Sequence, residues 1–343
     1  GDHRDLHKEY RRQRQMCIRD SNVADYSPEK VALICGIPEE TLREVARTYA
    51  TAESAIILWG MGISQHIHGT DNSRCLIALS LMTGQIGRPG TGLHPLRGQN
   101  NVQGTSDMGL IPMFFPDYKS VTDPENKKWF ENFWGTSLNP KTGLTVVEIV
   151  DAVHSGGVLG MYVQGENPAM SDPNLNHARG ALSMLEHLVV QDIFLTETAG
   201  FADVIFPASA FPEKSGTFTN SNRQVQLGRQ AIDPPGNARQ DWWIIQEVAQ
   251  RLGVDWSYDG PEEIFSEIRK ATPSMAGITW KRLQKEHSVT YPCNKEGDPG
   301  EAIVFRKGFP TANKKARFVP AKYTHADETV SYTHLTLPTI LLV

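Results

Sequence analysis

The sequence predicts an α/β protein built from doubly wound parallel-sheet domains, followed by the start of a C-terminal β domain. Two observations lead to this fold class. Apolar runs rich in β-branched residues occupy 55–59 and 158–163, and each is followed by a glycine-containing turn and a helical pattern. Strand and helix patterns then alternate as far as residue 207. Open parallel sheets bind ligands beyond the carboxyl ends of their strands, so both glycine turns are candidate binding positions.

The composition is that of an ordinary globular protein. Of the 343 residues, 39% are apolar and 21% are charged, and the formal net charge is −5. The length allows two or more packed units. Lysine and arginine are scattered beyond the first twenty residues, so no nucleic-acid partner is predicted. No apolar run is long enough for a membrane span, so none is predicted.

The chain contains four widely separated cysteines, namely Cys17, Cys35, Cys75 and Cys293. None is spaced as Cys-x-x-Cys, which excludes a zinc knuckle or an iron–sulfur ligand set in this stretch. The pattern fits a reducing compartment, and a cytoplasmic location is predicted. His66 and His68 could share one face of an extended segment, but no third ligand lies at motif spacing. The sequence therefore predicts no metal ligand.

Composition and pattern divide the chain into six segments. The two terminal segments lack an apolar period and join the rest abruptly, so we interpret them as non-native; flexible native tails are the alternative. The segments are 1–21 (non-native), 22–98 (first α/β domain), 99–207 (second α/β domain), 208–300 (interleaved loops and helices), 301–329 (start of a C-terminal β-barrel domain) and 330–343 (non-native tail).

The first α/β segment opens with two helices. A serine cap and a first-turn proline start one helix at Pro28, and Gly36 ends it. The next helix begins at Glu39. Residues 55–59 are predicted to be a buried parallel strand, and a glycine-rich turn connects them to a helix over 72–83.

Residues 84–118 are predicted to be a long ordered loop that wraps around a ligand. Its centre is LRGQNNVQG at 96–104. Arg97 offers a rigid fork of N–H donors, which suits a carboxylate or a phosphate. Four side-chain amides can pair with the edge of a polar heterocycle, and two glycines allow the backbone to approach a ligand. A surface loop of ordinary turn residues is the alternative.

The second α/β segment continues the alternation. Helices are predicted at 125–134, 144–154 and 173–186, and strands at 158–163, 187–192 and 203–207. Polar residues stand at two strand ends: Glu166 and Asn167, then Gln191 and Asp192. These side chains can bind ribose hydroxyls or the N–H groups of guanine, and helix capping is the alternative for each.

Beyond residue 207 the sequence predicts mixed structure. Residues 213–223 are predicted to be a polar loop. A helix then runs to Leu252, with Ile244, Ile245, Val248 and Leu252 facing inward. Helices follow near 261–271 and 279–286. Short apolar runs at 302–305 and 316–320 are predicted to be the first strands of a further β domain.

With these motifs in view, residues 22–328 resemble the catalytic alpha subunit of molybdenum- or tungsten-dependent formate dehydrogenases. The similarity is strongest to the soluble NAD-linked kind within the molybdopterin oxidoreductase family. It rests on WGMGISQ at 59–65, LMTGQIGRPG at 81–90 and above all LRGQNNVQG at 96–104. Support comes from QDIF at 191–194, ADVIFP at 202–207 and EKSGTFTN at 213–220.

The resemblance implies a function and a set of site residues. The chain would be a fragment of a subunit that oxidises formate to carbon dioxide, with Arg97 holding the formate carboxylate. Electrons would pass through iron–sulfur clusters to NAD on iron–sulfur/flavin partner subunits. The implied cofactors are bis(molybdopterin guanine dinucleotide) with molybdenum or tungsten, and a 4Fe–4S cluster whose ligands are absent from this sequence. The residues implied to line the pterin dinucleotides are Met61, Gln65, Gly98, Gln99, Asn100, Gly165, Glu166, Asn167, Gln191, Asp192 and Asp241.

The resemblance also carries departures and alternatives. None of the four cysteines matches the metal ligand of the family, so the isolated fragment is expected to be inactive. One alternative is another molybdopterin oxidoreductase such as a nitrate reductase, which LRGQNNVQG disfavours. Another is a cofactor-free structural large subunit of a respiratory-complex-like assembly. Arg97 and the amide cluster disfavour that alternative, because a scaffold has no use for an unpaired buried guanidinium.

Overall fold

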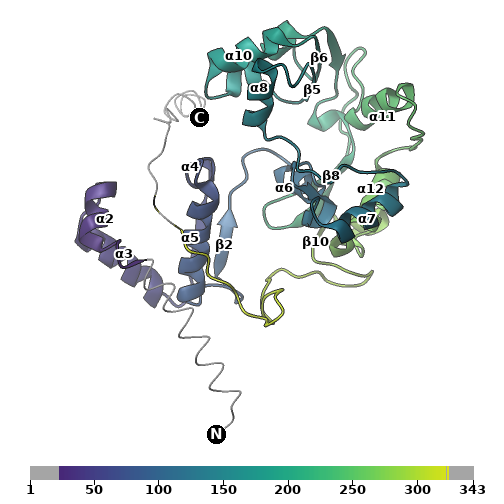
Figure 1. The fold of residues 1–343 in the computed structure, drawn as a ribbon. Coiled ribbons are helices and arrows are strands. Elements are labelled where there is room, and N and C mark those ends of the chain that lie inside the picture. Colours follow the sequence, from purple (N-terminus) through teal and green to yellow (C-terminus); the bar gives the residue numbers. More distant parts are fainter. Residues whose placement is uncertain (1–22, 322, 324–343) are drawn as a thin grey trace. The chain divides into compact units, whose positions relative to one another are not determined.

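The computed structural model describes residues 23–321 and 323, so both predicted non-native ends lie outside the described residues. The chain forms two compact units (Figure 1). Unit 1 contains the described residues up to Gly98 and from Ala302 onward, and unit 2 contains Gln99–Glu301. The predicted subdivision at residue 207 stays a prediction.

Unit 1 begins with the two predicted helices, α2 (Pro28–Cys35) and α3 (Glu39–Thr51). The Ser27 hydroxyl accepts a hydrogen bond from the N–H of Lys30 at the start of α2. Gly36 ends this helix in the left-handed conformation, at φ +69°, and its N–H donates to the carbonyl of Ala32. The local capping signals in the sequence therefore gave the correct helix ends.

The centre of unit 1 is a parallel pair of strands, β1 (Ile56–Trp59) and β2 (Gly92–Pro95). Helices α4 (Met61–Ser64) and α5 (Gly69–Met82) follow β1. The prediction that β1 is buried was wrong, because Ile56 and Leu58 are 49% and 59% exposed. Among the described residues this sheet has two strands, and side chains on both faces of β1 keep some exposed surface. Strand β2 was missed because glycine and proline at its ends are atypical of a strand.

The two strands predicted at 302–305 and 316–320 are absent. Residues 302–321 contain no strand, and they form turns and irregular segments in unit 1. Each predicted run has only four or five residues, and none finds a partner strand with which to form a hydrogen-bonded ladder. The predicted start of a β domain is therefore not seen here.

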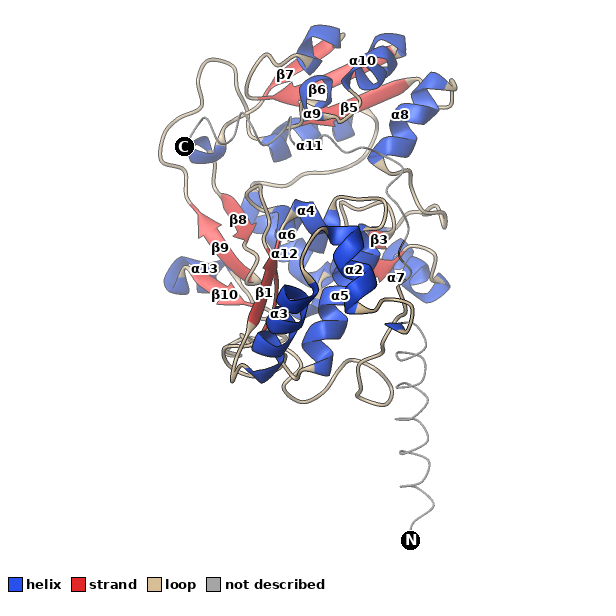
Figure 2. Ribbon diagram, turned by 90° about the vertical axis from the view of Figure 1, so that its left-hand side faces the viewer, coloured by secondary structure: helices blue, strands red, loops and turns tan. Residues whose placement is uncertain are grey.

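Unit 2 contains a parallel three-stranded sheet in the order β5-β6-β7, shown in red in Figure 2. Its strands are β5 (Gly160–Gln164), β6 (His187–Asp192) and β7 (Val204–Pro207). Side chains alternate along each strand, so Val190 and Gln191 face opposite sides. Val190 belongs to a buried cluster beneath α9 (Pro168–Ser171), α10 (Leu175–Met184) and the short helix η2 (Thr198–Phe201).

The opposite face of this sheet meets α11 (Asp241–Arg251), through a hydrogen bond from Gln191 to Asp241. Helix α8 (Val146–His154) packs against α10. Fewer apolar side chains of α11 are buried than was predicted. Ile244 is 5% exposed, but Ile245 and Leu252 are 37% and 78% exposed. The helix therefore buries a narrower side than its apolar content indicates.

A second sheet in unit 2 is antiparallel, in the order β10-β9-β8. Its strands are β8 (Gly216–Thr219), β9 (Gln224–Gly228) and β10 (Ser288–Thr290). Helices α12 (Pro261–Ala271) and α13 (Trp280–Glu286) pack with it around a core that includes Val225, Phe265 and Leu283. The prediction of a polar loop at 213–223 was wrong, because threonine and glycine residues in this stretch form β8 of a hairpin.

Several short elements lie in or next to the long loop that was predicted at 84–118. Residues 102–120 contain α6 (Val102–Asp107), β3 (Phe114–Phe115), the 3-10 turn η1 (Pro116–Tyr118) and β4 (Lys119–Ser120). Helix α7 (Pro124–Trp134) follows, and short 3-10 turns η3 (Phe211–Glu213) and η4 (Pro273–Met275) complete unit 2. None of the helices in the described residues has the length and apolar character needed to cross a membrane.

Candidate functional site

In unit 1 the predicted site residues lie at the carboxyl ends of the two parallel strands. Met61 begins α4 directly after β1, and its side chain is 49% exposed. Gln65 ends α4, with its N–H donating to the carbonyl of Met61 at 2.8 Å, and its side chain is exposed. Arg97 and Gly98 follow β2 and are also exposed. These residues are therefore accessible at the ligand-binding edge expected of a parallel sheet.

The motif LMTGQIGRPG has a structural function in unit 1. The Gln85 side chain is 1% exposed; its Oε1 accepts from the N–H of Ala55 at 3.0 Å, and its Nε2 donates to the carbonyl of Ala52 at 2.8 Å. Arg88 donates to the carbonyl of Glu53 at 2.9 Å and to Gln85 Oε1 at 3.1 Å. The backbone groups of 52–55, just before β1, thus find side-chain partners in this motif. The motif therefore fixes where β1 begins.

The amides of LRGQNNVQG divide into two groups. Gln99 and Asn100 are exposed in unit 2. Asn101 instead adopts the left-handed conformation, at φ +65°, and its Oδ1 accepts from the N–H of Thr219 at 2.9 Å. Gln103 Nε2 donates to the Tyr291 hydroxyl at 3.1 Å, and within the helix to Asp107 Oδ1 at 2.8 Å. The first two amides can meet a ligand, whereas the last two attach α6 to the body of unit 2.

Close packing explains the second glycine of this motif. A Cβ atom at Gly104 would lie 2.2 Å from Asn101 Oδ1, so a side chain there would displace the amide. On the same helix, the buried Asp107 carboxylate accepts a hydrogen bond from the Tyr291 hydroxyl at 2.8 Å. Burial, followed by the nearby charge of Asp107, raises the pKa of Tyr291 far above its ordinary range, so its hydroxyl stays protonated. This end of the motif is a rigid anchor.

At the carboxyl edge of the β5-β6-β7 sheet, two predicted residues are open to solvent. Gly165 has φ +63° and donates its N–H to the carbonyl of Gln191 at 2.9 Å, and no atom lies within 4 Å of where its Cβ would be. Glu166 is exposed. Burial, with a smaller contribution from the charge of Glu166, raises the pKa of Asp172. This edge therefore combines a backbone that a ligand can approach with an acidic side chain.

The Asn167 side chain bonds to residues about 30 positions further along the chain. Its Oδ1 accepts from the N–H and the hydroxyl of Thr198, at 3.1 and 2.8 Å, and its Nδ2 donates to Glu197 Oε2 at 2.7 Å. The last bond is the main reason why the pKa of Glu197 is lowered. The buried Thr198 hydroxyl in turn accepts from the N–H of Ala169 at 3.1 Å. These bonds join the start of α9 to η2, and the Asn167 side chain makes no capping bond to α9 itself.

Gln191 and Asp241 are hydrogen-bonded to each other, and Gln191 has no exposed surface. Gln191 is fully buried, its Nε2 donates to Asp241 Oδ1 at 2.8 Å, and its Oε1 accepts from the Tyr162 hydroxyl at 2.5 Å. Asp241 also forms an ion pair with Lys214. The neighbouring Asp192 is half-buried, and its Oδ1 accepts from the N–H of Ile193 at 2.6 Å. Tyr162 and Lys214 were not among the predicted site residues, although Lys214 lies within EKSGTFTN.

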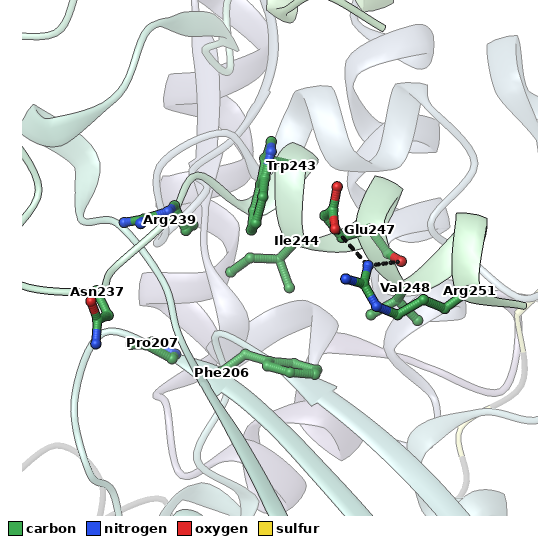
Figure 3. Close-up of a pocket in the computed structure, with 9 residues that line it drawn as sticks. All are labelled: Phe206, Pro207, Asn237, Arg239, Trp243, Ile244, Glu247, Val248 and Arg251. Atoms are coloured by element: carbon green, nitrogen blue, oxygen red, sulfur yellow. Dashed lines mark hydrogen bonds and ion pairs between the residues drawn. The ribbon is translucent and has the colours of Figure 1, made fainter. Parts of the chain in front are cut away.

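A pocket of about 490 Å³ lies between β7 and α11 (Figure 3). Phe206 and Pro207 lie opposite Trp243 and Ile244 across it. Other lining residues are Asn237, Arg239, Glu247, Val248 and Arg251. The Arg239 guanidinium carbon lies 5.9 Å from the centroid of the Trp243 ring, and Arg251 pairs with Glu247 at 2.5 Å. None of the predicted site residues lines this pocket.

No group of three or more histidine, cysteine, aspartate or glutamate side chains within residues 23–321 and 323 is placed to hold a metal ion. The sheet edge in unit 1 exposes a guanidinium and an amide, and the edge of the parallel sheet in unit 2 exposes a carboxylate and glycine backbone. Groups of these kinds fit a polar heterocycle or its anionic substituents better than a bare cation.

Residues 26–251 match the family model described as molybdopterin oxidoreductase. The chain belongs to this family. The match includes both parallel sheets and every predicted site residue. It confirms the predicted family.

Two relatives are alpha subunits of formate dehydrogenases. The F420-dependent formate dehydrogenase subunit alpha of Methanocaldococcus jannaschii is 47% identical over 309 residues, which cover 89% of this chain and 45% of the relative. The F420-dependent formate dehydrogenase 2 subunit alpha of Methanococcus maripaludis is 42% identical over 313 residues, covering 90% and 45%. The chain therefore spans less than half the length of these curated relatives.

A solved structure with a similar fold is acetylene hydratase from Pelobacter acetylenicus. Its TM-score is 0.63 at 18% sequence identity, over 93% of this chain and 47% of that chain. At this level of identity the comparison concerns the fold alone. It confirms the predicted mixed α/β architecture with parallel sheets.

Proposed function

We propose that this chain is part of the catalytic subunit of a formate dehydrogenase, which oxidises formate to carbon dioxide. The observation that carries the proposal is the exposed Arg97 at the head of LRGQNNVQG, directly after a parallel strand. The names of the relatives support the reaction. The activity would belong to a holoenzyme of the relatives' full length that contains this chain.

Arg97 would bind the carboxylate of formate. A guanidinium donates two parallel N–H bonds to a carboxylate, which fixes both the position and the rotation of the substrate. Formate has only one carbon, so fixing its two oxygens also fixes the direction of its C–H bond. Lysine would keep the charge but lose this orientation.

The cofactor would be a pair of pterin guanine dinucleotides, and the sheet edge of each unit is taken by itself as a place where such a group can bind. When bound, its molybdenum or tungsten centre supplies the acceptor for the two electrons of formate. Met61, Gln65, Gly98, Gln99 and Asn100 are exposed and can contact such a group. In unit 2, Gly165 and Glu166 are open, and the carboxylate of Glu166 suits the N–H donors of guanine. The contacts of Asn167, Gln191 and Asp241 favour a supporting function instead.

The electron acceptor would lie on a partner subunit that is reached through iron–sulfur clusters, one of them a 4Fe–4S cluster. The soluble type that the sequence resembles uses NAD, whereas the relatives carry F420 in their names. Both acceptors take up the two electrons as a hydride, so nothing in the formate-binding chemistry distinguishes them. We propose a cytoplasmic location because four scattered cysteines fit a reducing compartment.

The test is an arginine-to-lysine exchange in the holoenzyme. Arg97→Lys should lower kcat/KM for formate by about 100-fold or more, because orientation of a reacting bond contributes several kcal/mol to catalysis. Arg74→Lys is the matched control, since Arg74 forms an ordinary surface pair with Asp71 in the same unit. Unchanged kinetics in Arg97→Lys, with metal and pterin retained, would remove the proposed role.

A further inference from the structure

Four side chains from distant parts of unit 2 form one hydrogen-bonded chain behind the carboxyl edge of the parallel sheet. Lys214 Nζ pairs with Asp241 Oδ2 and also donates to the carbonyl of Ser209 at 3.1 Å. Asp241 Oδ1 accepts from Gln191 Nε2 at 2.8 Å. The Tyr162 hydroxyl then donates to Gln191 Oε1 at 2.5 Å. The chain thus connects an ion pair to a tyrosine that is 41% exposed.

The charges at one end fix the direction of every bond in this chain. A carboxylate only accepts and an ammonium only donates, so Asp241 must face the NH2 group of Gln191. The carbonyl oxygen of Gln191 must then face Tyr162, and a hydroxyl that faces an acceptor donates its proton. The Tyr162 proton is therefore directed inward, and only its lone pairs remain for an outside group.

Burial prevents the carboxamide from turning over. Gln191 has no exposed surface, so water cannot replace a lost partner. Rotating the amide would place its buried oxygen against the half-buried Asp241 carboxylate, so that two acceptors oppose each other, which is costly. Burial, with a smaller contribution from the charge of Asp241, also raises the pKa of Tyr162, so the hydroxyl keeps its proton at neutral pH.

We propose that Lys214 and Asp241 are positioning residues that make the Tyr162 hydroxyl a hydrogen-bond acceptor for an N–H group of the nucleotide part of the cofactor. Guanine carries two adjacent N–H donors on its pairing edge, N1–H and the 2-amino group. A hydroxyl that can only accept suits such an edge and does not suit one that presents acceptors. This inference rests on the proposed function, because it assigns Tyr162, Gln191, Asp241 and Lys214 to the same cofactor edge.

The experiment measures binding of GMP to the full 343-residue chain by calorimetry, with circular dichroism to check folding. Tyr162→Phe removes the acceptor, and Asp241→Asn removes the charge that orients Gln191. Each should weaken GMP binding about five- to tenfold, the equivalent of one net hydrogen bond. The double variant should bind no more weakly than Tyr162→Phe alone, because both changes act through the same hydroxyl. Glu247→Gln, further along α11, is the control and should leave GMP binding unchanged.

Lys214 provides a second comparison that does not depend on the stability of Asp241→Asn. Lys214→Met should reproduce the loss, and Lys214→Arg should restore binding because it keeps the charge beside Asp241. Independent, additive losses in Tyr162→Phe and Asp241→Asn would overturn the positioning function. Normal GMP binding in both Lys214→Met and Asp241→Asn would overturn it as well. A wild-type chain that binds no GMP would instead remove the proposed nucleotide site itself.

Discussion

Replacing Asn101 tests whether the second half of LRGQNNVQG is an anchor. The Asn101 side chain accepts from the backbone N–H of Thr219, a residue that is 6% exposed and lies 118 positions along the chain. Its backbone is in the left-handed conformation, at φ +65°. Alanine removes the acceptor and tolerates this conformation poorly. Glycine removes the acceptor but adopts the conformation freely.

The expected loss of unfolding free energy is nearly equal for the alanine and glycine variants, although its causes differ. Leaving the buried N–H of Thr219 without a partner costs about 2 kcal/mol. Alanine in a left-handed conformation costs about 1 kcal/mol more. Glycine avoids that strain but gains flexibility in the unfolded chain, which costs about 0.5–1 kcal/mol. Both variants should therefore lose about 3 kcal/mol of unfolding free energy, and glycine should not rescue stability.

Urea unfolding of the 343-residue chain, followed by tryptophan fluorescence, measures this loss. Asn100→Ala is the matched control, because Asn100 is the adjacent exposed amide and should change stability by less than about 0.5 kcal/mol. If Asn101→Gly unfolds at the same urea concentration as the wild type, Asn101 serves only its backbone conformation. The division of the motif into exposed and anchored halves would then be wrong.

Three further changes probe the rest of the structure. Gln85→Leu should lower the unfolding free energy by about 2 kcal/mol, because the N–H of Ala55 and the carbonyl of Ala52 lose their partners; a loss no larger than that of the exposed Gln65→Leu would contradict this. Tyr291→Phe should cost about 2 kcal/mol in thermal or urea unfolding, since the buried Asp107 loses a charge-assisted donor. Burial and a hydrogen bond to Glu267 raise the pKa of Tyr258 from its ordinary 10.0 to about 12. Because the pKa of Tyr258 is higher in the folded state than in the unfolded chain, its protonated hydroxyl stabilises the fold. This stabilisation is complete below pH 10 and is lost as the pH rises toward 12. Tyr258→Phe should therefore flatten the alkaline decline, and a tyrosinate absorbance titration that shows no late-ionising group would refute the assignment.

Local signals in the sequence were sufficient for much of the fold. The serine–proline start and the Gly36 end of α2 are set by groups within a few residues of each other. Strand β6 (His187–Asp192) was predicted with its exact bounds, because its apolar run is bounded by polar residues. Strand β2 and the β8–β9 hairpin were missed. They are held by partner strands rather than by their own composition, which is rich in glycine, proline and polar residues.

The sequence does not distinguish the separate contacts that the predicted site residues make in the structure. Gln99, Asn100 and Asn101 are chemically almost identical in a one-dimensional pattern. Only the long-range contact between Asn101 and Thr219 separates the anchor from the exposed amides. The same holds for Gln191 and Asp241, which were predicted to line a cofactor. Their hydrogen bond joins β6 to the start of α11 across 50 positions of the chain, a relation that no local motif encodes.

The most direct measurement is the release of labelled carbon dioxide from labelled formate by the holoenzyme that contains this chain, together with its pterin content. We expect stoichiometric pterin and formate-dependent release that Arg97→Lys lowers by about 100-fold or more while pterin is retained. A folded holoenzyme with pterin content near zero would contradict the account, and the chain would then be a scaffolding member of its family.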